Sequence, residues 1–313
     1  MATSQFTTYY SSDTSAPVLN GQSGSLNTVL NAILVTGYGS KPAAGWTLEF
    51  TSSNTYGSCF RPASGSRFYL SVDDGAPFTV KEARLRGLEV ATSWNSGSGQ
   101  FPVGSAFEFT RKSNTNDTTA RPWIAFADAY TMYFFADQAT NGIYYVMAFG
   151  DIYSFKTTAD DYRCLLLGHG GAESTTTTGN STGGNFSLVN AADDGMNLAR
   201  TYGGGGVAVA AGKHAGNWYA FTATSMIGLN TYPNPENNAV YMSPVMVHES
   251  TIAAVRGKMR GLYYLAAPLA SLSDGETFSG SNSYVGKVFQ VVQTVSNGGR
   301  WVIEISNTVD TND

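Results

Sequence analysis

The chain has 313 residues, with 18 Lys and Arg against 23 Asp and Glu and a formal net charge of −5. A protein that holds nucleic acid by its phosphates needs a clustered basic surface, so this balance argues against general nucleic-acid binding. Charged residues make up 13% of the chain and aromatic residues also 13%, whereas soluble domains usually carry about 25% charged residues. Aromatic strands joined by Gly, Ser, Thr and Asn turns are typical of antiparallel sheets, so the composition predicts an ordered, mainly β fold.

Two features bear on where the protein is made. No stretch reaches the roughly 18 consecutive apolar residues that a membrane-spanning helix needs. The N-terminal sequence MATSQFTTYYSSDT lacks the basic region followed by an apolar region that marks a signal peptide. We therefore expect a chain made in the cytosol, not exported by the general route, and without a membrane partner.

The first element predicted along the chain is a helix over Ser25–Val35. Its apolar residues recur at the spacing of one helical face: Leu26, Val29, Leu30, Ile33 and Leu34. We expect Ser23 or Ser25 to cap its N-terminus and Gly37 to end it in a left-handed conformation. Because about three turns are marginal alone, the apolar stripe must dock on the chain's own sheet or on a neighbouring subunit.

After the helix the pattern changes to the two-residue period of β-strands, in short segments separated by turn signals. This spacing predicts antiparallel sandwich- or barrel-like sheets. The predicted strands include Arg67–Val72, Glu82–Val90, Trp123–Ala127, Thr131–Phe135, Ile143–Met147, Arg163–Leu167, Val240–Glu249 and Gly257–Leu265. A hairpin is predicted where Val288–Val295 and Arg300–Ser306 flank a Ser-Asn-Gly-Gly turn.

The segment Gly168–Asn197 is the part of lowest complexity and is predicted to be a linker or a surface loop. It divides the chain into an N-terminal β-rich domain, residues 1–167, and a C-terminal β-rich domain, residues 198–313. The densest basic stretch, Arg256, Lys258 and Arg260, lies in the second. Its alternation predicts one solvated strand face, with contact to an acidic partner as the alternative.

A search for catalytic and metal-binding patterns assigns no such residues. His169, His214 and His248 lack metal-ligand spacing. No serine lies in a Gly-x-Ser-x-Gly strand-to-helix elbow, and the glycine runs lack the rest of a phosphate-loop pattern. We therefore expect no catalytic residues, no cofactor and no bound metal, and we expect that the protein is not an enzyme.

Acid pairs and cysteines receive structural predictions. The pairs Asp73-Asp74, Asp160-Asp161 and Asp193-Asp194 each stand beside a turn signal, so we expect turns, with weak Ca²⁺ ligation as the alternative. Cys59 and Cys164 are far apart and lack CxxC spacing. We expect buried free thiols, and a single disulfide is the alternative.

Three stretches together resemble a known family. They are Ala16–Phe50, Arg111–Asp128 and Arg256–Gly280. Their order and their amino-acid sequences resemble those of minor virion structural proteins of tailed bacteriophages and prophages of Gram-negative bacteria. The similarity spans most of the chain, but its motifs are helix, turn and strand segments without catalytic residues. The resemblance implies a place in a virus particle, with portal, adaptor, tail or capsid subunits as partners. It does not fix which part of the particle.

Two kinds of contact residue are predicted from this hypothesis. For a homo-oligomeric or mixed virion assembly, the arm Gln5–Asp13 and the helix stripe would bind neighbours; the candidates are Phe6, Tyr9, Tyr10, Leu26, Leu30, Ile33 and Leu34. The alternative function is a host-surface glycan-binding module of the tail. Its candidates are loop aromatics whose rings would stack on sugars, Trp94, Trp218 and Tyr232.

Overall fold

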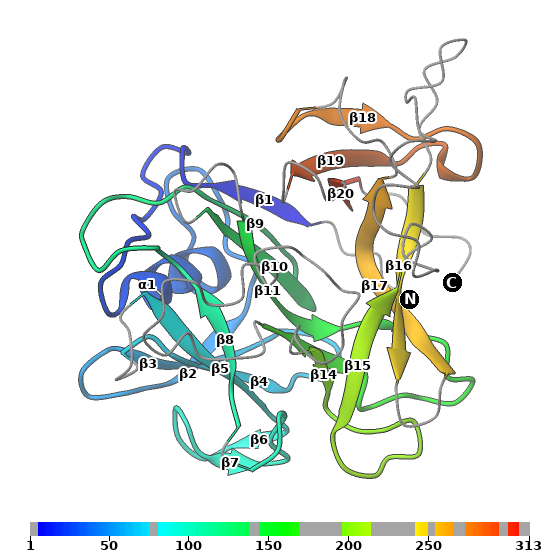
Figure 1. Ribbon diagram of the computed structural model, residues 1–313, viewed down its shortest axis with the longest axis horizontal. Helices are drawn as coiled ribbons and strands as arrows, with labels where there is room; N and C mark the ends of the chain where they lie inside the picture. Colours follow the sequence, from blue (N-terminus) through cyan, green and yellow to red (C-terminus); the bar gives the residue numbers. More distant parts are fainter. Residues whose placement is uncertain are drawn as a thin grey trace.

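A computed structural model of the chain describes residues 6–75, 81–104, 106–137, 144–168, 196–213, 242–249, 254–265, 273–293 and 300–306. These residues form a mainly β structure of antiparallel sheets with one short helix near the N-terminus (Figure 1). The predicted fold class is confirmed. No helix among the described residues is long and apolar enough to cross a membrane.

The largest sheet contains thirteen strands within the described part of the chain. Twelve follow one another across the sheet, and β12 (Tyr153–Ser154) pairs with β17 from the side. In order across the sheet the twelve are β1 (Thr7–Tyr10), β9 (Trp123–Ala127), β10 (Thr131–Asp137), β11 (Tyr144–Asp151), β13 (Cys164–Leu167), β14 (Met196–Leu198), β15 (Ala208–Lys213), β16 (Met242–Glu249), β17 (Ala254–Leu265), β20 (Arg300–Glu304), β19 (Val288–Gln293) and β18 (Thr277–Ser279).

Two smaller sheets lie beside it. One has five strands, in the order β2 (Thr47–Thr51), β3 (Gly57–Arg61), β4 (Tyr69–Asp73), β5 (Glu82–Leu88) and β8 (Glu108–Arg111). The other is a two-stranded ribbon of β6 (Val90–Ala91) and β7 (Gly97–Ser98). Figure 1 shows the five-stranded sheet on the side of the molecule away from β16 and β17, with the ribbon below it.

The predicted helix is confirmed, but its capping prediction is wrong. An α-helix over Ser25–Asn31, α1, continues directly into a π-helical turn over Ala32–Thr36. Gly24, with φ 82°, occupies the N-cap position without a side-chain cap, and Asp74 accepts the hydrogen bonds of the first amides instead. Gly37 ends the helical segment with a positive φ of 74°, as predicted, but its ψ of 174° is not that of the left-handed helical conformation.

The centre of the large sheet is buried on both faces. In β9 the residues Trp123, Ala125 and Ala127 belong to one core, which contains the helix stripe and the inner face of the five-stranded sheet. Ile124 and Phe126 belong to a second core, which β16, β17, β19 and β20 cover. Burial on both faces explains why the sequence of β9, WIAFA, is continuously apolar rather than alternating.

The far end of the large sheet bends back towards its beginning. Thr8 of β1 and Gln290 of β19 are joined by a hydrogen bond of 3.4 Å. The Tyr133 hydroxyl in β10 donates to the carbonyl oxygen of Arg260 in β17, at 2.8 Å. Strands far apart in sheet order therefore enclose the second core between them.

Strands from both predicted domains pair within this sheet. Leu165–Leu167 of β13 pair with Met196–Leu198 of β14, which in turn pairs with β15. The predicted division at Gly168–Asn197 therefore does not coincide with a break in the sheet, and residues 169–195 of that segment lie outside the described residues. The predicted C-terminal hairpin is confirmed as β19–β20, paired from Phe289↔Glu304 to Gln293↔Arg300.

Candidate interaction surface and its buried ion-pair base

The basic stretch of β17 is not a solvated face. Arg256 and Arg260 are buried, which corrects the prediction made from their alternation. The reason is that other segments cover these side chains: Tyr202, Asp160 and Glu249 lie against Arg256. The groups against Arg260 are Tyr130, Tyr153 and Asp128. Each buried guanidinium has a carboxylate partner, since Arg260 donates to Asp128 at 2.9 Å and Arg256 contacts Asp160 and Glu249.

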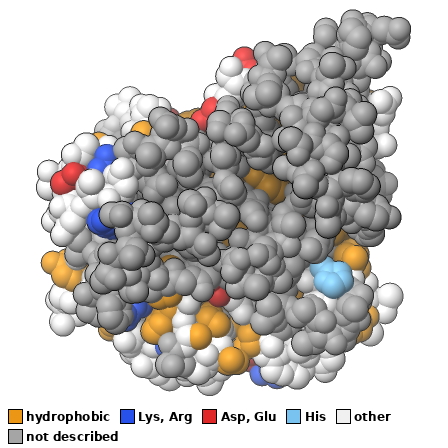
Figure 2. All heavy atoms as spheres, viewed as in Figure 1, with side chains coloured by type: hydrophobic (Ala, Val, Ile, Leu, Met, Phe, Trp, Pro, Cys, Tyr) orange, Lys and Arg blue, Asp and Glu red, His pale blue; other side chains and the backbone are white. Residues whose placement is uncertain are grey.

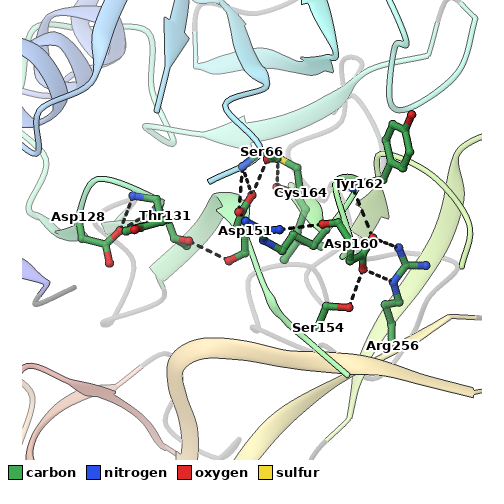
Figure 3. Close-up of polar contacts among 12 residues, drawn as sticks. Ser66, Asp128, Thr131, Asp151, Ser154, Asp160, Tyr162, Cys164 and Arg256 are labelled. Carbon is green, nitrogen blue, oxygen red and sulfur yellow. Dashed lines mark hydrogen bonds and ion pairs between the residues drawn. The ribbon is translucent and has the colours of Figure 1, made fainter. Parts of the chain in front are cut away.

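Arg256 is the centre of a network that joins four segments. Its Nε and Nη2 donate to the two oxygens of Asp160, at 2.9 and 2.8 Å, and its Nη1 donates to Glu249 at 2.9 Å (Figure 3 shows the contacts with Asp160). Asp160 also accepts from the Ser154 hydroxyl at 2.6 Å, and Glu249 accepts the Tyr202 amide. Burial alone would raise the pKa of Asp160, but the hydrogen bonds from Arg256 and Ser154 outweigh it and hold that pKa below its usual value.

Three large apolar side chains are exposed around this network. Phe155 is 49% exposed, Val255 41% and Tyr202 38%, and we call them the Phe155 patch. Phe155 and Val255 flank Arg256 through the backbone, because the Phe155 amide donates to the Arg256 carbonyl at 2.9 Å. The Tyr202 ring lies 5.4 Å from the Arg256 guanidinium and 5.4 Å from Lys156 Nζ. The three exposed side chains therefore belong to segments that the Arg256 network joins by buried charge pairs.

A second carboxylate cluster fastens the five-stranded sheet to the large one. Asp151, at the end of β11, accepts from the amide and hydroxyl of Ser66 in the β3–β4 connection, and pairs with Arg163 at 2.7 Å (Figure 3). Burial raises the pKa of Asp151, although Ser66 and Arg163 oppose the rise. The nearby Cys164 thiol has a pKa raised well above its usual value by burial, so it stays protonated at neutral pH and is a poor nucleophile.

Six of the seven predicted interface residues lie inside the chain's own core. Phe6, Tyr9, Leu26, Leu30, Ile33 and Leu34 are buried, and only Tyr10 is half-buried. The arm is not free, because β1 pairs with β9 of the same chain from Thr7↔Ala127 to Tyr10↔Ile124. The apolar stripe of the helix was expected to dock on the chain's own sheet or on a neighbouring subunit, and in the structure it packs on the chain's own sheets. We therefore withdraw these buried residues as contact candidates.

The predicted glycan-contact residues are only partly described. Trp94, in the turn of the β6–β7 ribbon, lies with its indole directly against Gly57 of β3, where a Cβ atom would overlap the ring. Its carbonyl oxygen accepts from the Ser71 hydroxyl at 2.7 Å. Trp94 thus packs on the five-stranded sheet and does not project as a free stacking platform. Trp218 and Tyr232 lie outside the described residues.

The remaining sequence predictions have mixed outcomes. Cys59 and Cys164 are buried free thiols, as expected. Asp73 forms the predicted turn by accepting the Gly75 amide at 3.1 Å, whereas Asp74 and Asp160 have helix-capping and ion-pair roles that the sequence pattern did not indicate. His248 lies half-buried on β16, while His169, His214 and Asp193-Asp194 lie outside the described residues. No group of three possible metal ligands occurs in the described part of the chain.

The Phe155 patch was not found by sequence reasoning. Phe155 follows a two-residue strand, Tyr202 precedes a glycine run, and Val255 is the second residue of a long strand. None of these positions departs from an ordinary strand or turn pattern. The sequence signal nearest to the patch was the pair Arg256 and Arg260, because residues four apart on a strand share one face of the sheet.

The fold and the described residues define a mainly β protein built from stacked antiparallel sheets. Comparison with known proteins finds no matching family model and no matching curated protein. Any inference about the class of protein to which the chain belongs therefore rests on its own residues and fold.

Glu108 of β8 provides a test of the packing between the two sheets. It is buried, and its Oε1 accepts from the Asn197 amide at 2.6 Å, while its Oε2 has no hydrogen-bond partner among the described residues. Burial raises its pKa to about 7, with Asn197 opposing the rise. The folded state therefore prefers the protonated acid, and stability is lost as pH rises from about 4.5 to about 7.

We expect Glu108→Gln to remove that loss, because glutamine keeps the acceptor for Asn197 without the charge. The variant should be more stable than wild type by about 1–3 kcal/mol at pH 8 and equally stable near pH 4. Urea unfolding at both pH values measures this. Equal stability at pH 8 would contradict a buried, destabilising carboxylate, and Glu49→Gln on exposed β2 serves as the matched control.

Proposed function

We propose that the chain is a structural component of a tailed-phage virion that acts by associating with other subunits. Neck, tail, baseplate and head-decorating positions all suit such a role. The resemblance of three stretches to minor virion proteins supports the proposal, and so does the mainly β, charge-poor architecture. The observation that carries it is the Phe155 patch, three exposed apolar side chains on segments joined by the buried Arg256 network.

The chemistry of the patch suits protein association. Tyrosine and phenylalanine are enriched in interface cores, where they bury large areas at low entropic cost. The base of the patch is preorganised, because Arg256, Asp160 and Glu249 pair with one another and Glu249 holds the Tyr202 amide. Binding would then order few side chains, and that reduces the entropic cost of association. Lys156 at the edge supplies a polar rim, since it donates to the Tyr202 carbonyl at 3.1 Å.

The test has two parts, and the first is the location of the chain. Particles from a producing lysate are purified and analysed by mass spectrometry and cryo-electron microscopy. We expect the chain in intact particles at a stoichiometric copy number. Its absence from purified virions would overturn the proposal.

The second part asks whether the Phe155 patch makes the contact. We expect Phe155→Ser with Val255→Ser to lower incorporation into particles at least about tenfold, because interface aromatics often contribute 2 kcal/mol or more. The control is Val18→Ser with Val285→Ser, which changes side chains that are 55% and 74% exposed elsewhere on the molecule. Equal incorporation of both double variants would exclude the patch as the contact surface.

A further inference from the structure

A cleft separate from the Phe155 patch lies between two loops. Its volume is about 570 Å³, and it opens between residues 89–104, which include the β6–β7 ribbon, and the turn 199–207 that follows β14. Glycines of both segments line it together with Glu89, Val103, Arg200 and Val207. In Figure 2 the part of this face over β6 and β14 is mostly orange and white, with few charged side chains.

One charge pair joins the two walls of the cleft. Arg200 Nε and Nη2 donate to the two oxygens of Glu89 at 2.6 and 2.7 Å, a bidentate geometry. Arg200 Nη1 also donates to the Gly204 carbonyl at 3.3 Å, and the guanidinium lies 4.2 Å from the Tyr162 ring centre. Three contacts therefore fix the orientation of a side chain that remains 35% exposed.

The pair retains hydrogen-bonding capacity after these contacts. A guanidinium has five N–H groups, and the contacts of Arg200 with Glu89 and Gly204 use three of them, which leaves about two. Each Glu89 oxygen accepts one bond from Arg200 and has a second lone pair. Donors and acceptors thus lie side by side, and a hydroxyl group, which both donates and accepts, matches this arrangement.

The charge of the cleft selects against ionic ligands. An anion drawn to Arg200 would meet the Glu89 carboxylate, and a cation drawn to Glu89 would meet the guanidinium, so the pair as a whole favours a neutral ligand. Val103, which is 61% exposed, and Val207 add apolar surface beside the polar pair. A volume of this order holds a small organic ligand.

From these features we propose that the cleft between residues 89–104 and 199–207 binds a neutral saccharide. Ring hydroxyls bridge Glu89 and Arg200, and the C–H face of the sugar packs on Val103 and the glycine backbone. The glycines matter because nothing lies within 4 Å of where a Cβ would stand at Gly104, Gly204 or Gly206. Tyr202 of the Phe155 patch lies in the same turn but does not line the cleft, and the substitutions that test saccharide binding and virion assembly are at different residues.

The experiment measures binding of a disaccharide panel to the purified full chain by saturation-transfer NMR and calorimetry. The panel contains neutral lactose, cellobiose and diacetylchitobiose, anionic digalacturonate and the cationic glucosamine dimer. Gly206→Leu fills the cleft, because Gly206 has no positive φ and open space beside it. Gly203→Leu is the matched control, since Gly203 lies in the same turn with equally open surroundings but does not line the cleft.

We expect at least one neutral disaccharide to bind, Gly206→Leu to weaken that binding at least about tenfold, and Gly203→Leu to change it by less than about twofold. A second variant, Arg200→Lys, keeps the charge but removes the bidentate geometry, and we expect it to weaken binding as well. Binding of no panel member, preference for the anionic or cationic sugar, or equal effects of the two glycine variants would each overturn the proposal. Thermal unfolding of every variant confirms that the chain is folded.

Discussion

Replacing Arg256 by Met is expected to cost about 3–5 kcal/mol of folding free energy, because it leaves two buried carboxylates without their counter-ion. Asp160 and Glu249 are both buried and both hydrogen-bonded to this guanidinium. Since domains of ordinary stability have about 5–15 kcal/mol in total, the variant should unfold at a much lower urea concentration. Urea unfolding followed by tryptophan fluorescence measures the change.

The control for this substitution is Arg67→Met, at an exposed arginine whose side chain has no hydrogen bond or ion pair among the described contacts. We expect that variant to lie within about 0.5 kcal/mol of wild type. A triple variant, Arg256→Met with Asp160→Asn and Glu249→Gln, should recover part of the loss because no uncompensated charge remains. A loss below about 1 kcal/mol for Arg256→Met alone would contradict the assignment of the network as the base of the patch.

Asp74 is the second position where a single change is expected to have a large effect. Its Oδ2 accepts the amides of Leu26 and Asn27, at 2.8 and 3.3 Å, and its Oδ1 pairs with Lys112, which is equally buried. Asp74→Ala removes the helix cap and leaves the Lys112 ammonium without its carboxylate, so we expect a loss of about 3–5 kcal/mol. Asp74→Asn keeps an acceptor for the helix amides and should lose less.

The measurement is made at pH 7.5, because burial raises the pKa of Asp74 to about 6 and the carboxyl must be ionised. Amide hydrogen exchange at Leu26 and Asn27 should accelerate more in the alanine variant than in the asparagine variant. Asp73→Asn is the matched control, since the neighbouring Asp73 carboxylate accepts the Gly75 amide and does not cap the helix. If the alanine variant were as stable as wild type, the helix would not depend on this cap.

Features that depend on neighbouring residues in the chain were predicted well from the sequence. The helix over residues 25–35 follows from the spacing of Leu26, Val29 and Leu30, and the structure places helical residues from 25 to 36. The C-terminal hairpin follows from its glycine-containing turn and flanking strands. Periodicity and turn chemistry act over a few residues, so the printed sequence contains most of the information they need.

Features that depend on partners distant in the sequence were predicted poorly. Arg256 and Asp160 are 96 residues apart, and the Asp74 carboxylate accepts from Leu26, which lies 48 residues earlier. A pattern of alternating charge looks the same whether its face meets water or buried carboxylates, and only the approach of Asp160, Glu249 and Asp128 to this face of β17 decides between them. The interface candidates failed for the same reason, because an apolar stripe does not reveal which surface covers it.

The sequence by itself determined that this protein is mainly β and where its helix and hairpin lie, because composition and local periodicity constrain these. The tertiary structure alone decided that β9 and β10 are covered on both faces, that the basic stretch is internal, and that Phe155, Tyr202 and Val255 remain exposed. Burial and charge pairing are properties of segments brought together from distant positions. The free energy of those contacts is set by the fold as a whole, and no short window of sequence contains both partners.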